Sequence, residues 1–322
     1  MSGVPTVGRE AAAPRADRTQ GRWRRWLRRI ALGCLLPLGL AVWYFNLPAF
    51  AWHWGAIALT GTPAGAVLHE YRVAVDGVAI AGLTRNASGL TYNPATGTLF
   101  AVINRPQQVA ELSVDGELLR LMPIVGARDT EGIAHVRDEV FVISDEADNR
   151  LYRVRIAADT REIAVDSADS LALTPAWMDN QGVEGLSWDA RAQRLLVVEE
   201  KWPMRVTEIV GAGPWLAGEP LDEAVLTHQP ASASVFTADL SSVEVHPASG
   251  NLLLLSDLTG VITEHAPDGT ALGVLPLWRG YRGLSESVPQ AEGLAVGADG
   301  ALYVLSEPNL FYRFERTAPA AR

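Results

Sequence analysis

The chain has 322 residues, of which 48% are hydrophobic and 20% charged, a composition that excludes a disordered chain and predicts a sizeable core. Its formal net charge of −10 is unevenly distributed, because residues 1–29 carry +6 and the remainder carries −16. So acidic a body argues against nucleic acid as a partner and favours cations or basic ligands. The single cysteine, Cys34, excludes an intrachain disulfide and a cysteine-based metal site.

The amino-terminal segment has the pattern of a membrane-targeting sequence. Residues 1–29 form a basic tail, rich in Arg, Ala, Gly and Pro, that we expect to be disordered and cytoplasmic. The apolar run 30–50 follows, and as a helix it would span about 31 Å, close to the roughly 30 Å thickness of a bilayer core. Tryptophans gather at its far end, as in the interfacial belt of membrane proteins. We therefore predict a single-pass signal anchor over 30–54, a linker over 55–66, and a body outside the cytoplasm.

Two other interpretations of this segment stay open. Ala49-Phe-Ala51 fits the small-x-small pattern of a cleaved signal peptide. A retained anchor is favoured because the apolar run exceeds the roughly 7–15 residues of a signal core. Lipidation at Cys34 is the weakest alternative, since Leu35 to Phe45 continues the apolar core beyond it.

Residues 67–316 contain an internal repeat. Five segments share one plan: a small or acidic residue, usually a glycine, a short strand, a turn, and a stronger apolar strand that ends in a polar residue. A repeat of about 50 residues holding about four strands is typical of one propeller blade. The first positions of the five repeats are Ser88, Glu131, Glu184, Ser241 and Glu292.

The ends of this domain predict how the ring closes. The last repeat stops after its third strand, near Glu315, and an unassigned strand, 67–75, precedes the first repeat. We expect this strand to complete the last blade, because pairing the two ends removes an exposed sheet edge. The predicted fold is therefore an all-β, five-bladed β-propeller, followed by a short tail at 317–322. Six blades are the alternative if 214–227 belongs to a blade of its own.

Several of these segments resemble the SdiA-regulated family of membrane-anchored bacterial propellers. The resemblance is carried by Leu83-Thr-Arg-Asn-Ala-Ser-Gly-Leu-Thr-Tyr-Asn-Pro94, Leu99–Asn104, Asp129-Thr-Glu-Gly-Ile-Ala134 and Val183–Leu186. It implies a propeller in the periplasm or outside the cell, anchored in the inner membrane with the amino terminus in the cytoplasm. It also implies a connection with calcium, but no reaction. Ser242 departs from the pattern, which has glycine at that position.

The repeated first position predicts where a ligand binds. The first strand of each propeller blade lines the central channel, so Glu131, Glu184 and Glu292 should converge there, with Ser88 and Ser241 completing the ring. Carboxylates that meet in this way repel one another unless they are protonated or share a cation. Oxygen ligands without cysteine or paired histidine favour Ca²⁺, or another hard divalent cation. Asp129, Asp239 and Asn104 are candidate metal ligands beside them, and Arg85 and Asn86 candidate channel-mouth or anion-binding residues.

Other interpretations of these carboxylates remain. Each ring glutamate could instead accept backbone N–H bonds that tie neighbouring blades together, or the three could form a protonated cluster. A second set of acidic residues ends the second strands and is expected to be solvated rather than ligating: Asp145, Glu146, Glu199, Glu200, Asp257 and Glu307. The segment Glu184-Gly-Leu-Ser-Trp188 is also similar to a metal-ligand motif of gluconolactonase-type calcium propellers.

The sequence contains no G-x-S-x-G, H-E-x-x-H, P-loop or C-x-x-C motif, and its six histidines lack metal-ligand spacing. These absences favour a binding or sensing module that holds a divalent cation and contacts an envelope protein or a small ligand. The alternative is a metal-dependent hydrolase, of lactonase or phosphoesterase type, with a channel carboxylate as base. A scaffold without an ion is the third possibility.

Overall fold

The computed structural model describes residues 18–173, 182–200, 204–221 and 225–317. The expected tails are described only in part, since residues 1–17 and 318–322 lie outside these ranges. The chain divides into two compact units, Met1–Tyr44 and Phe45–Arg322. The first unit contains one helix, α1 (Arg18–Tyr44), which includes the arginine cluster that the sequence analysis assigned to the tail.

The predicted anchor segment is not one continuous helix. A second helix, α2, runs from Leu47 to Thr60, and Asn46 before it has a left-handed backbone (φ 49°). Pro48 in the first turn of α2 lacks the N–H that a continuous helix would use. Among the described helices none alone is long and apolar enough to span a membrane, but Arg28–Tyr44 and Leu47–Thr60 together are, by length and composition.

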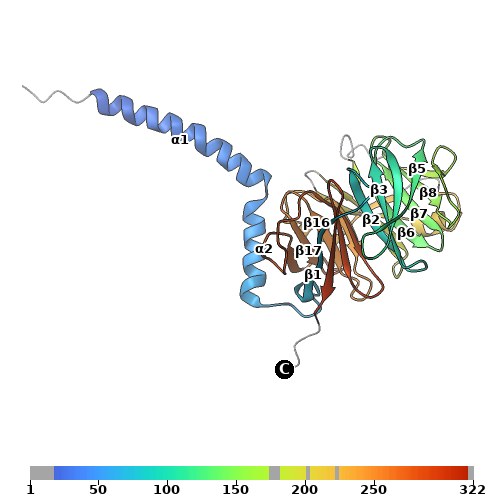
Figure 1. The fold of residues 1–322 in the computed structure, drawn as a ribbon. Coiled ribbons are helices and arrows are strands. Elements are labelled where there is room, and N and C mark those ends of the chain that lie inside the picture. Colours follow the sequence, from blue (N-terminus) through green and yellow to red (C-terminus); the bar gives the residue numbers. More distant parts are fainter. Residues whose placement is uncertain (1–17, 174–181, 201–203, 222–224, 318–322) are drawn as a thin grey trace, which may run out of the picture. The chain divides into compact units, whose positions relative to one another are not determined.

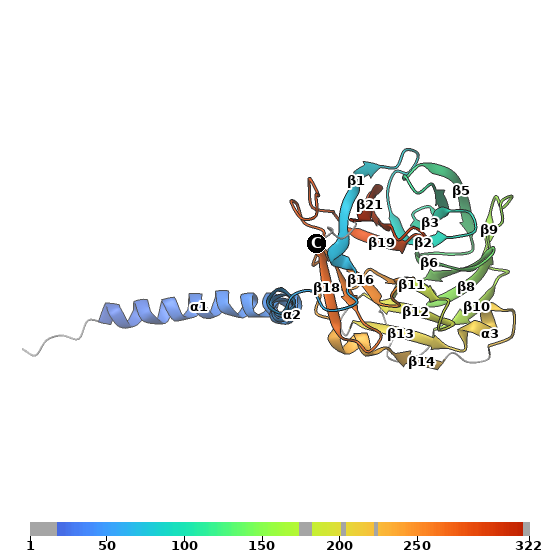
Figure 2. The ribbon, with the colours of Figure 1, turned by 90° about the horizontal axis from the view of Figure 1, so that it is seen from below.

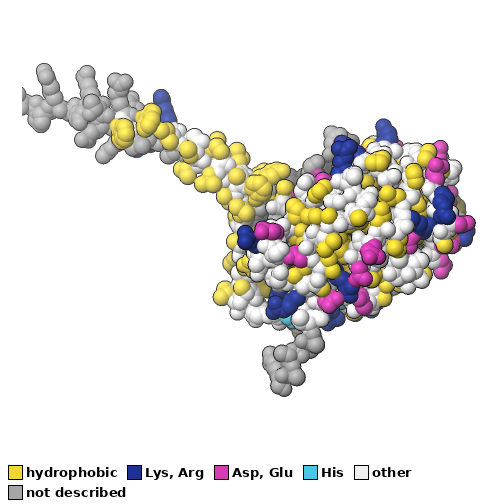
Figure 3. Space-filling view, viewed as in Figure 1, with side chains coloured by type: hydrophobic (Ala, Val, Ile, Leu, Met, Phe, Trp, Pro, Cys, Tyr) yellow, Lys and Arg dark blue, Asp and Glu magenta, His cyan; other side chains and the backbone are white. Residues whose placement is uncertain are grey.

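Helix α2 belongs to the second unit, in which it packs against the propeller (Figure 1). The indole of Trp54 stacks on that of Trp278, with ring centroids 5.7 Å apart, and the imidazole of His53 stacks on Phe236 at 4.6 Å. These contacts favour a helix where a linker was predicted from residue 55. Figure 3 shows hydrophobic side chains along α2, whose sequence contains no charged residue.

Five antiparallel sheets confirm the five-bladed propeller, and Figure 2 shows them arranged around a common axis. Blade 1 contains β2 (Ala87–Asn93), β3 (Thr98–Asn104), β4 (Gln107–Leu112) and β5 (Leu118–Val125). Blade 2 contains β6 (Thr130–Arg137), β7 (Val140–Asp145), β8 (Arg150–Arg155) and β10 (Asp169–Ala172). Blade 3 contains β11 (Val183–Asp189), β12 (Arg194–Glu199), β13 (Arg205–Val210) and β14 (Val225–His228). Blade 4 contains β15 (Ser242–Val245), β16 (Leu252–Ser256), β17 (Val261–His265) and β18 (Ala271–Pro276).

Blade 5 closes the ring as predicted. It contains β19 (Ala291–Val296), β20 (Leu302–Ser306), β21 (Leu310–Arg316) and, as its outer strand, β1 (Tyr71–Ala79) from the other end of the domain. Tyr71 pairs with Arg316 and Ala79 with Leu310. A 3-10 turn, η1 (Leu68–Glu70), leads into β1.

The described residues of segment 214–227 belong to blade 3 and form no sixth blade. The short helix α3 (Ala212–Leu216) precedes β14, and β14 pairs with β13 as the outer strand of blade 3. A second 3-10 turn, η2 (Pro230–Ser234), leads towards blade 4. A strand that the repeat did not predict, β9 (Ile163–Ala164), leaves blade 2 and pairs in parallel with β5 of blade 1.

The core lies between the blades. Each of the five hydrophobic clusters in the described residues joins two neighbouring sheets. In β3, Leu99 and Ala101 pack towards blade 5, whereas Phe100 and Val102 pack towards blade 2. The middle strands are therefore apolar on both faces, because each face is covered by another blade.

The glycine of the repeat allows the inner strands to approach one another. A Cβ on Gly89 would lie 2.6 Å from the carbonyl oxygen of Glu131, and one on Gly293 would lie 2.8 Å from that of Ser88. A Cβ on Gly185 would lie 2.7 Å from the Cα of Ser242, the residue that departs from the pattern. At the four glycines of this position, neighbouring backbone leaves no room for a side chain, so the first strands lie close together.

Candidate functional site

The five repeat positions lie at the starts of the inner strands. Glu131, Glu184 and Glu292 are the second residues of β6, β11 and β19, and Ser88 lies in β2. Burial is the main cause that raises the pKa of Glu184 to about 10, and the charges of Glu131, Glu146, Glu200 and Glu292 contribute. Burial likewise raises the pKa of Glu292 to about 8. These carboxyls share one electrostatic environment and retain protons at neutral pH.

A subset of the acidic residues forms a tighter cluster, the acidic triad, which contains Asp129, Glu131 and Glu146. One carboxylate oxygen from each lies within 4.8 Å of those of the other two. The β6–β7 hairpin explains this, because Thr130 pairs with Asp145 and the residues that flank this pair become neighbours. The backbone N–H of Glu146 donates to the carbonyl oxygen of Asp129 at 2.8 Å.

Glu131 is held in place by blade 1. The hydroxyl of Ser88 donates to Oε2 of Glu131 at 2.6 Å, and Nδ2 of Asn104 donates to Oε1 at 2.7 Å. Burial raises the pKa of Glu131 to about 7, the two hydrogen bonds oppose this shift, and the charges of Asp129 and Glu146 add to it. The carboxyl is thus oriented by neutral donors, with no cationic partner among these contacts.

Two oxygen atoms beside Glu131 lack a hydrogen-bond donor. Oδ1 of Asn104 and Oδ1 of Asp129 are buried and have no hydrogen-bond partner among the described residues. A buried oxygen without a donor is energetically costly. Together with the triad carboxylates, these atoms make an oxygen-only donor set of the kind that suits Ca²⁺.

The sequence model of the SdiA-regulated family matches residues 64–315. This chain belongs to the SdiA-regulated family. The match covers the whole propeller and confirms the resemblance carried by the motifs of blades 1 to 3. The family name describes no reaction or ligand.

Three solved structures are similar to this SdiA-regulated protein at low sequence identity. The crystal structure of Myxococcus xanthus glutaminyl cyclase matches with a TM-score of 0.50 and 15% identity, covering 77% of this chain and 97% of that one. A luciferin-regenerating enzyme matches with a TM-score of 0.47 and 12% identity, over 75% and 95% of the two chains. A chain of a nidogen/laminin complex matches with a TM-score of 0.44 and 12% identity, over 69% and 73%. The first of these supports a shared propeller fold.

The remaining candidate residues lie outside the acidic triad. Glu184 and Glu292 are on other blades of the SdiA-regulated propeller. Asp239 accepts hydrogen bonds from the Ser256 hydroxyl and from the backbone N–H groups of Asp257 and Leu258, so its carboxylate holds a loop of blade 4. Burial raises its pKa to about 6. The Ser241 hydroxyl donates to the carbonyl oxygen of Ala291 and ties blade 4 to blade 5.

Arg85 and Asn86 lie on the loop before β2. Arg85 is exposed. Asn86 has a left-handed backbone (φ 60°), and its carbonyl oxygen accepts a hydrogen bond from the N–H of Asn104 at 3.2 Å. This bond connects the loop to the residue that orients Glu131. The loop thus supports the acidic triad from blade 1.

The expectation of solvated carboxylates at the ends of the second strands was wrong for Asp145 and Glu199, which are 1% and 0% exposed. The carboxylate of Asp145 accepts the N–H groups of Arg128 and Asp148, so it orders its own loop. Glu146 belongs to the triad, and its side chain lies against Gly182, which precedes β11 of the next blade. A Cβ on Gly182 would overlap Cγ of Glu146 at 1.8 Å.

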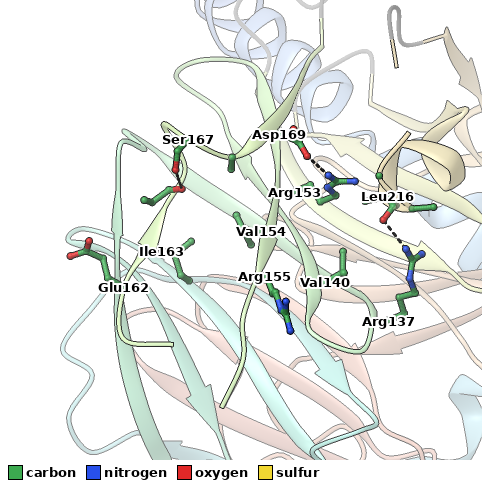
Figure 4. A pocket seen from close by; sticks show the side chains of 14 residues that line it. Arg137, Val140, Arg153, Val154, Arg155, Glu162, Ile163, Ser167, Asp169 and Leu216 are labelled. Atoms are coloured by element: carbon green, nitrogen blue, oxygen red, sulfur yellow. Dashed lines mark hydrogen bonds and ion pairs between the residues drawn. The ribbon is translucent and has the colours of Figure 1, made fainter. Parts of the chain in front are cut away.

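A cavity of about 520 Å³ lies between blades 2 and 3. Figure 4 shows Arg137 and Arg153 beside Leu216 and Asp169. Arg137 donates to the carbonyl oxygen of Leu216 at 2.9 Å, and Arg153 donates to that of Trp215 and forms an ion pair with Asp169. These arginines cap the last carbonyls of α3. Both arginines therefore connect blade 2 to blade 3.

Proposed function

We propose that this protein is a membrane-anchored, extracytoplasmic propeller that binds a divalent cation, Ca²⁺ in preference, at the acidic triad. The observation that carries the proposal is the convergence of three carboxylates, beside which Oδ1 of Asn104 is buried without a donor, as is Oδ1 of Asp129 within the triad itself. Asp129, Glu131 and Glu146 would hold the ion, and Asn104 would contribute its Oδ1. A bound cation would relieve the repulsion between the carboxylates and provide a partner for both oxygens.

The proposed location is the bacterial inner membrane, with the amino terminus in the cytoplasm. The support is the arginine-rich start of α1 and the combined length and apolar character of Arg28–Tyr44 and Leu47–Thr60. The packing of Phe50 and Trp54 on the propeller would keep the domain next to the bilayer. The proposed partners are the membrane and an envelope protein or small ligand.

A binding or sensing role is favoured over a hydrolase. A metal-dependent hydrolase of the expected type needs an ionised channel carboxylate as base. In the metal-free protein Glu184 and Glu292 hold their protons at neutral pH, because burial raises their pKa values to about 10 and about 8. In this state they can donate a proton but cannot accept one. Glu131 is assigned to the proposed ion and accepts hydrogen bonds from Ser88 and Asn104.

The proposal is tested by thermal unfolding of the full-length protein in detergent after treatment with EDTA. Added Ca²⁺ should raise the melting temperature, because an ion at a hundredfold excess over its Kd stabilises the folded state by about 2.7 kcal/mol. Glu131→Gln and Glu146→Gln should each remove most of the shift. Glu286→Gln, at a 73% exposed side chain, is the matched control and should retain it.

A further variant separates the triad from the wider ring. Glu292→Gln should keep the Ca²⁺-dependent shift if the triad holds the ion, and lose it if the three ring glutamates do. The absence of any shift in the unmodified protein would contradict the proposal.

A further inference from the structure

The channel has a second mouth, where the inner strands end. A cavity of about 710 Å³ lies there, lined by residues from the last parts of all five inner strands. This volume is within the range of small-molecule sites. The acidic triad is at the other ends of these strands, and three residues of strand separate the two levels by about 10 Å. The cavity is therefore distinct from the proposed cation site.

The repeat pattern explains why a cavity exists at this mouth and why one acidic side chain lines it. Thr91, Ser187 and Glu244 occupy the same position of three repeats, the third residue after the first position, and all line the cavity. The corresponding residues of the other two blades are Ala134 and Ala295. Thr91 and Ser187 are short and leave room in the cavity, and the long side chain of Glu244 extends from β15 of blade 4.

The histidines at this mouth make hydrogen bonds to other residues of the protein. Nδ1 of His246 bonds the Ser249 hydroxyl at 2.9 Å, and its Nε2 lies 3.4 Å from the Tyr71 hydroxyl. Nε2 of His135 lies 3.0 Å from the carbonyl oxygen of Asp138. Burial lowers the pKa of both rings, that of His246 to about 4, so they are neutral at physiological pH.

The charged residues of the rim also have partners. Asp189 forms an ion pair with Arg194 at 3.0 Å. Arg137 donates to the carbonyl oxygen of Leu216, and Arg191 donates to that of Ala248. Asp138 is at the exposed edge. Glu244 is thus the acidic group that the interior of the cavity offers to a ligand.

Glu244 is a half-buried carboxyl among apolar walls. Its Oε2 accepts a hydrogen bond from the Ser187 hydroxyl at 3.0 Å. Burial raises its pKa to about 8, and the hydrogen bonds from Ser187 and from the Val296 N–H oppose this shift. Both hydrogen-bond partners are neutral. A cation placed beside this carboxyl would stabilise its ionised form.

The walls and the overall charge define which cation fits. Tyr92 and Trp188 provide aromatic surface, and Pro94, Pro247 and Val296 provide aliphatic surface. A single carboxylate in apolar surroundings does not meet the ligand number that Ca²⁺ or Mg²⁺ requires. A molecule with an apolar body and an ammonium group matches both features, since aromatic faces attract such cations. The charge of −16 on residues 30–322 also favours a cation over an anion.

We propose that the second mouth of the channel binds a small organic cation, an alkyl or aryl amine whose ammonium group pairs with Glu244 and whose apolar body contacts Trp188 and Tyr92. This binding is independent of the metal. It would give the propeller a small-molecule site on the face opposite the acidic triad.

The test is isothermal titration calorimetry of the full-length protein in detergent at neutral pH, with EDTA present. The probes are phenethylammonium and hexylammonium chlorides, with 2-phenylethanol and phenylacetate as neutral and anionic analogues of the first. The two ammonium probes should bind. Both analogues should bind at least about tenfold more weakly, because they lack the charge that pairs with Glu244.

Variants then identify the residue. Glu244→Gln should weaken binding of phenethylammonium by about ten- to a hundredfold, as expected for loss of a charged hydrogen bond. Glu286→Gln is the matched control on the surface and should bind like the unmodified protein. If Glu244→Gln does not fold, the comparison of ammonium, neutral and anionic probes on the unmodified protein still decides the question. Absence of ammonium binding, equal binding of the analogues, or unchanged affinity in a folded Glu244→Gln variant would overturn the proposal.

Discussion

Three glutamates of the inner strands show how burial at a common position changes their chemistry. Glu131, Glu184 and Glu292 have pKa values raised to about 7, 10 and 8, and burial is the largest cause in each case. An unfolded chain leaves glutamate near its ordinary pKa of about 4.3. Between that value and the folded values the native protein binds more protons than the unfolded chain does.

This difference fixes the sign of the pH dependence. For the metal-free protein we expect the free energy of unfolding to fall as the pH rises from 7 to 8, because stability decreases with pH wherever the native state holds more protons. Each such proton contributes at most about 1.4 kcal/mol per pH unit. Below about pH 6.5 the buried His246 and His265, whose pKa values are lowered to about 4, act in the opposite sense. Urea unfolding in EDTA at several pH values measures the slope. Glu184→Gln should flatten it, and a stability that rises over this interval would contradict the burial of these carboxyls.

Glu146 is the triad residue that the sequence did not predict as a metal ligand. The repeat identified Glu131, and the loop before it identified Asp129, because both are close to the repeated glycine in the sequence. Glu146 follows a strand end where solvated carboxylates are usual, and its direction is set by Gly182 of the next blade. The residues around position 146 do not indicate which part of another blade will pack against its side chain. The sequence therefore predicted two of the three triad residues.

At the scale of elements, the glycine of the repeat determines how tightly the inner strands pack. Gly89 has an ordinary backbone conformation, so a side chain there is prevented by its neighbours alone. The carbonyl oxygen of Glu131, the Cα of Gly132 and the N of Ile133 would lie within 3.0 Å of an added Cβ. These are backbone atoms of β6 and have little freedom to move.

We therefore expect Gly89→Ala to lower the free energy of unfolding by about 1–3 kcal/mol, the usual cost of overpacking. Because the contact is with the backbone of Glu131, the substitution should also weaken Ca²⁺ binding. Chemical denaturation with and without Ca²⁺ measures both effects. Gly55→Ala is the control, since nothing lies within 4 Å of a Cβ there and alanine favours a helix. Equal stability of Gly89→Ala and the unmodified protein would show that the inner strands can separate.

Two elements departed from the predicted pattern for tertiary reasons. Strand β9 leaves blade 2 to pair with β5, which shortens the outer strand of blade 2 to Asp169–Ala172. Helix α2 extends to Thr60, and its residues Phe50 and Trp54 pack on Phe236 and Trp278 beside blade 4. Neither partner is near in the sequence, so periodicity and turn residues gave no signal for them.

At the scale of the whole molecule, the ring depends on joining the two ends of the domain. The pairing of β1 with β21 provides the backbone bonds, and a buried carboxylate holds the segment before β1. Glu264 accepts the N–H groups of Val67 and Leu68 at 2.8 to 3.0 Å, and Nδ2 of Asn251 donates to it at 2.6 Å. Glu264 is on β17, so this contact connects the entering chain to blade 4.

Glu264→Gln should lower the free energy of unfolding by about 1–3 kcal/mol. The NH₂ group of the glutamine would replace one carboxylate oxygen and could not accept a hydrogen bond from the backbone N–H groups. Limited proteolysis should also cleave faster within residues 61–66, next to the loosened segment. Denaturation curves and cleavage rates measure the two effects, with Glu286→Gln as the exposed control. Unchanged values for both would show that β1–β21 pairing closes the ring without this contact.

The sequence by itself determined the number of blades, their order and the closure, because repeat length, strand alternation and turn residues are local properties that recur five times. It also identified the repeated position at which Glu131, Glu184 and Glu292 become buried. Only the tertiary structure decided that Asp129, Glu131 and Glu146 form the triad, that Glu244 lines a cavity at the other mouth, and that α2 packs on blade 4. These features arise from contacts between parts of the chain that are distant in the sequence. A sequence repeat predicts the strands of each blade, but it does not predict which side chains of a neighbouring blade will contact them.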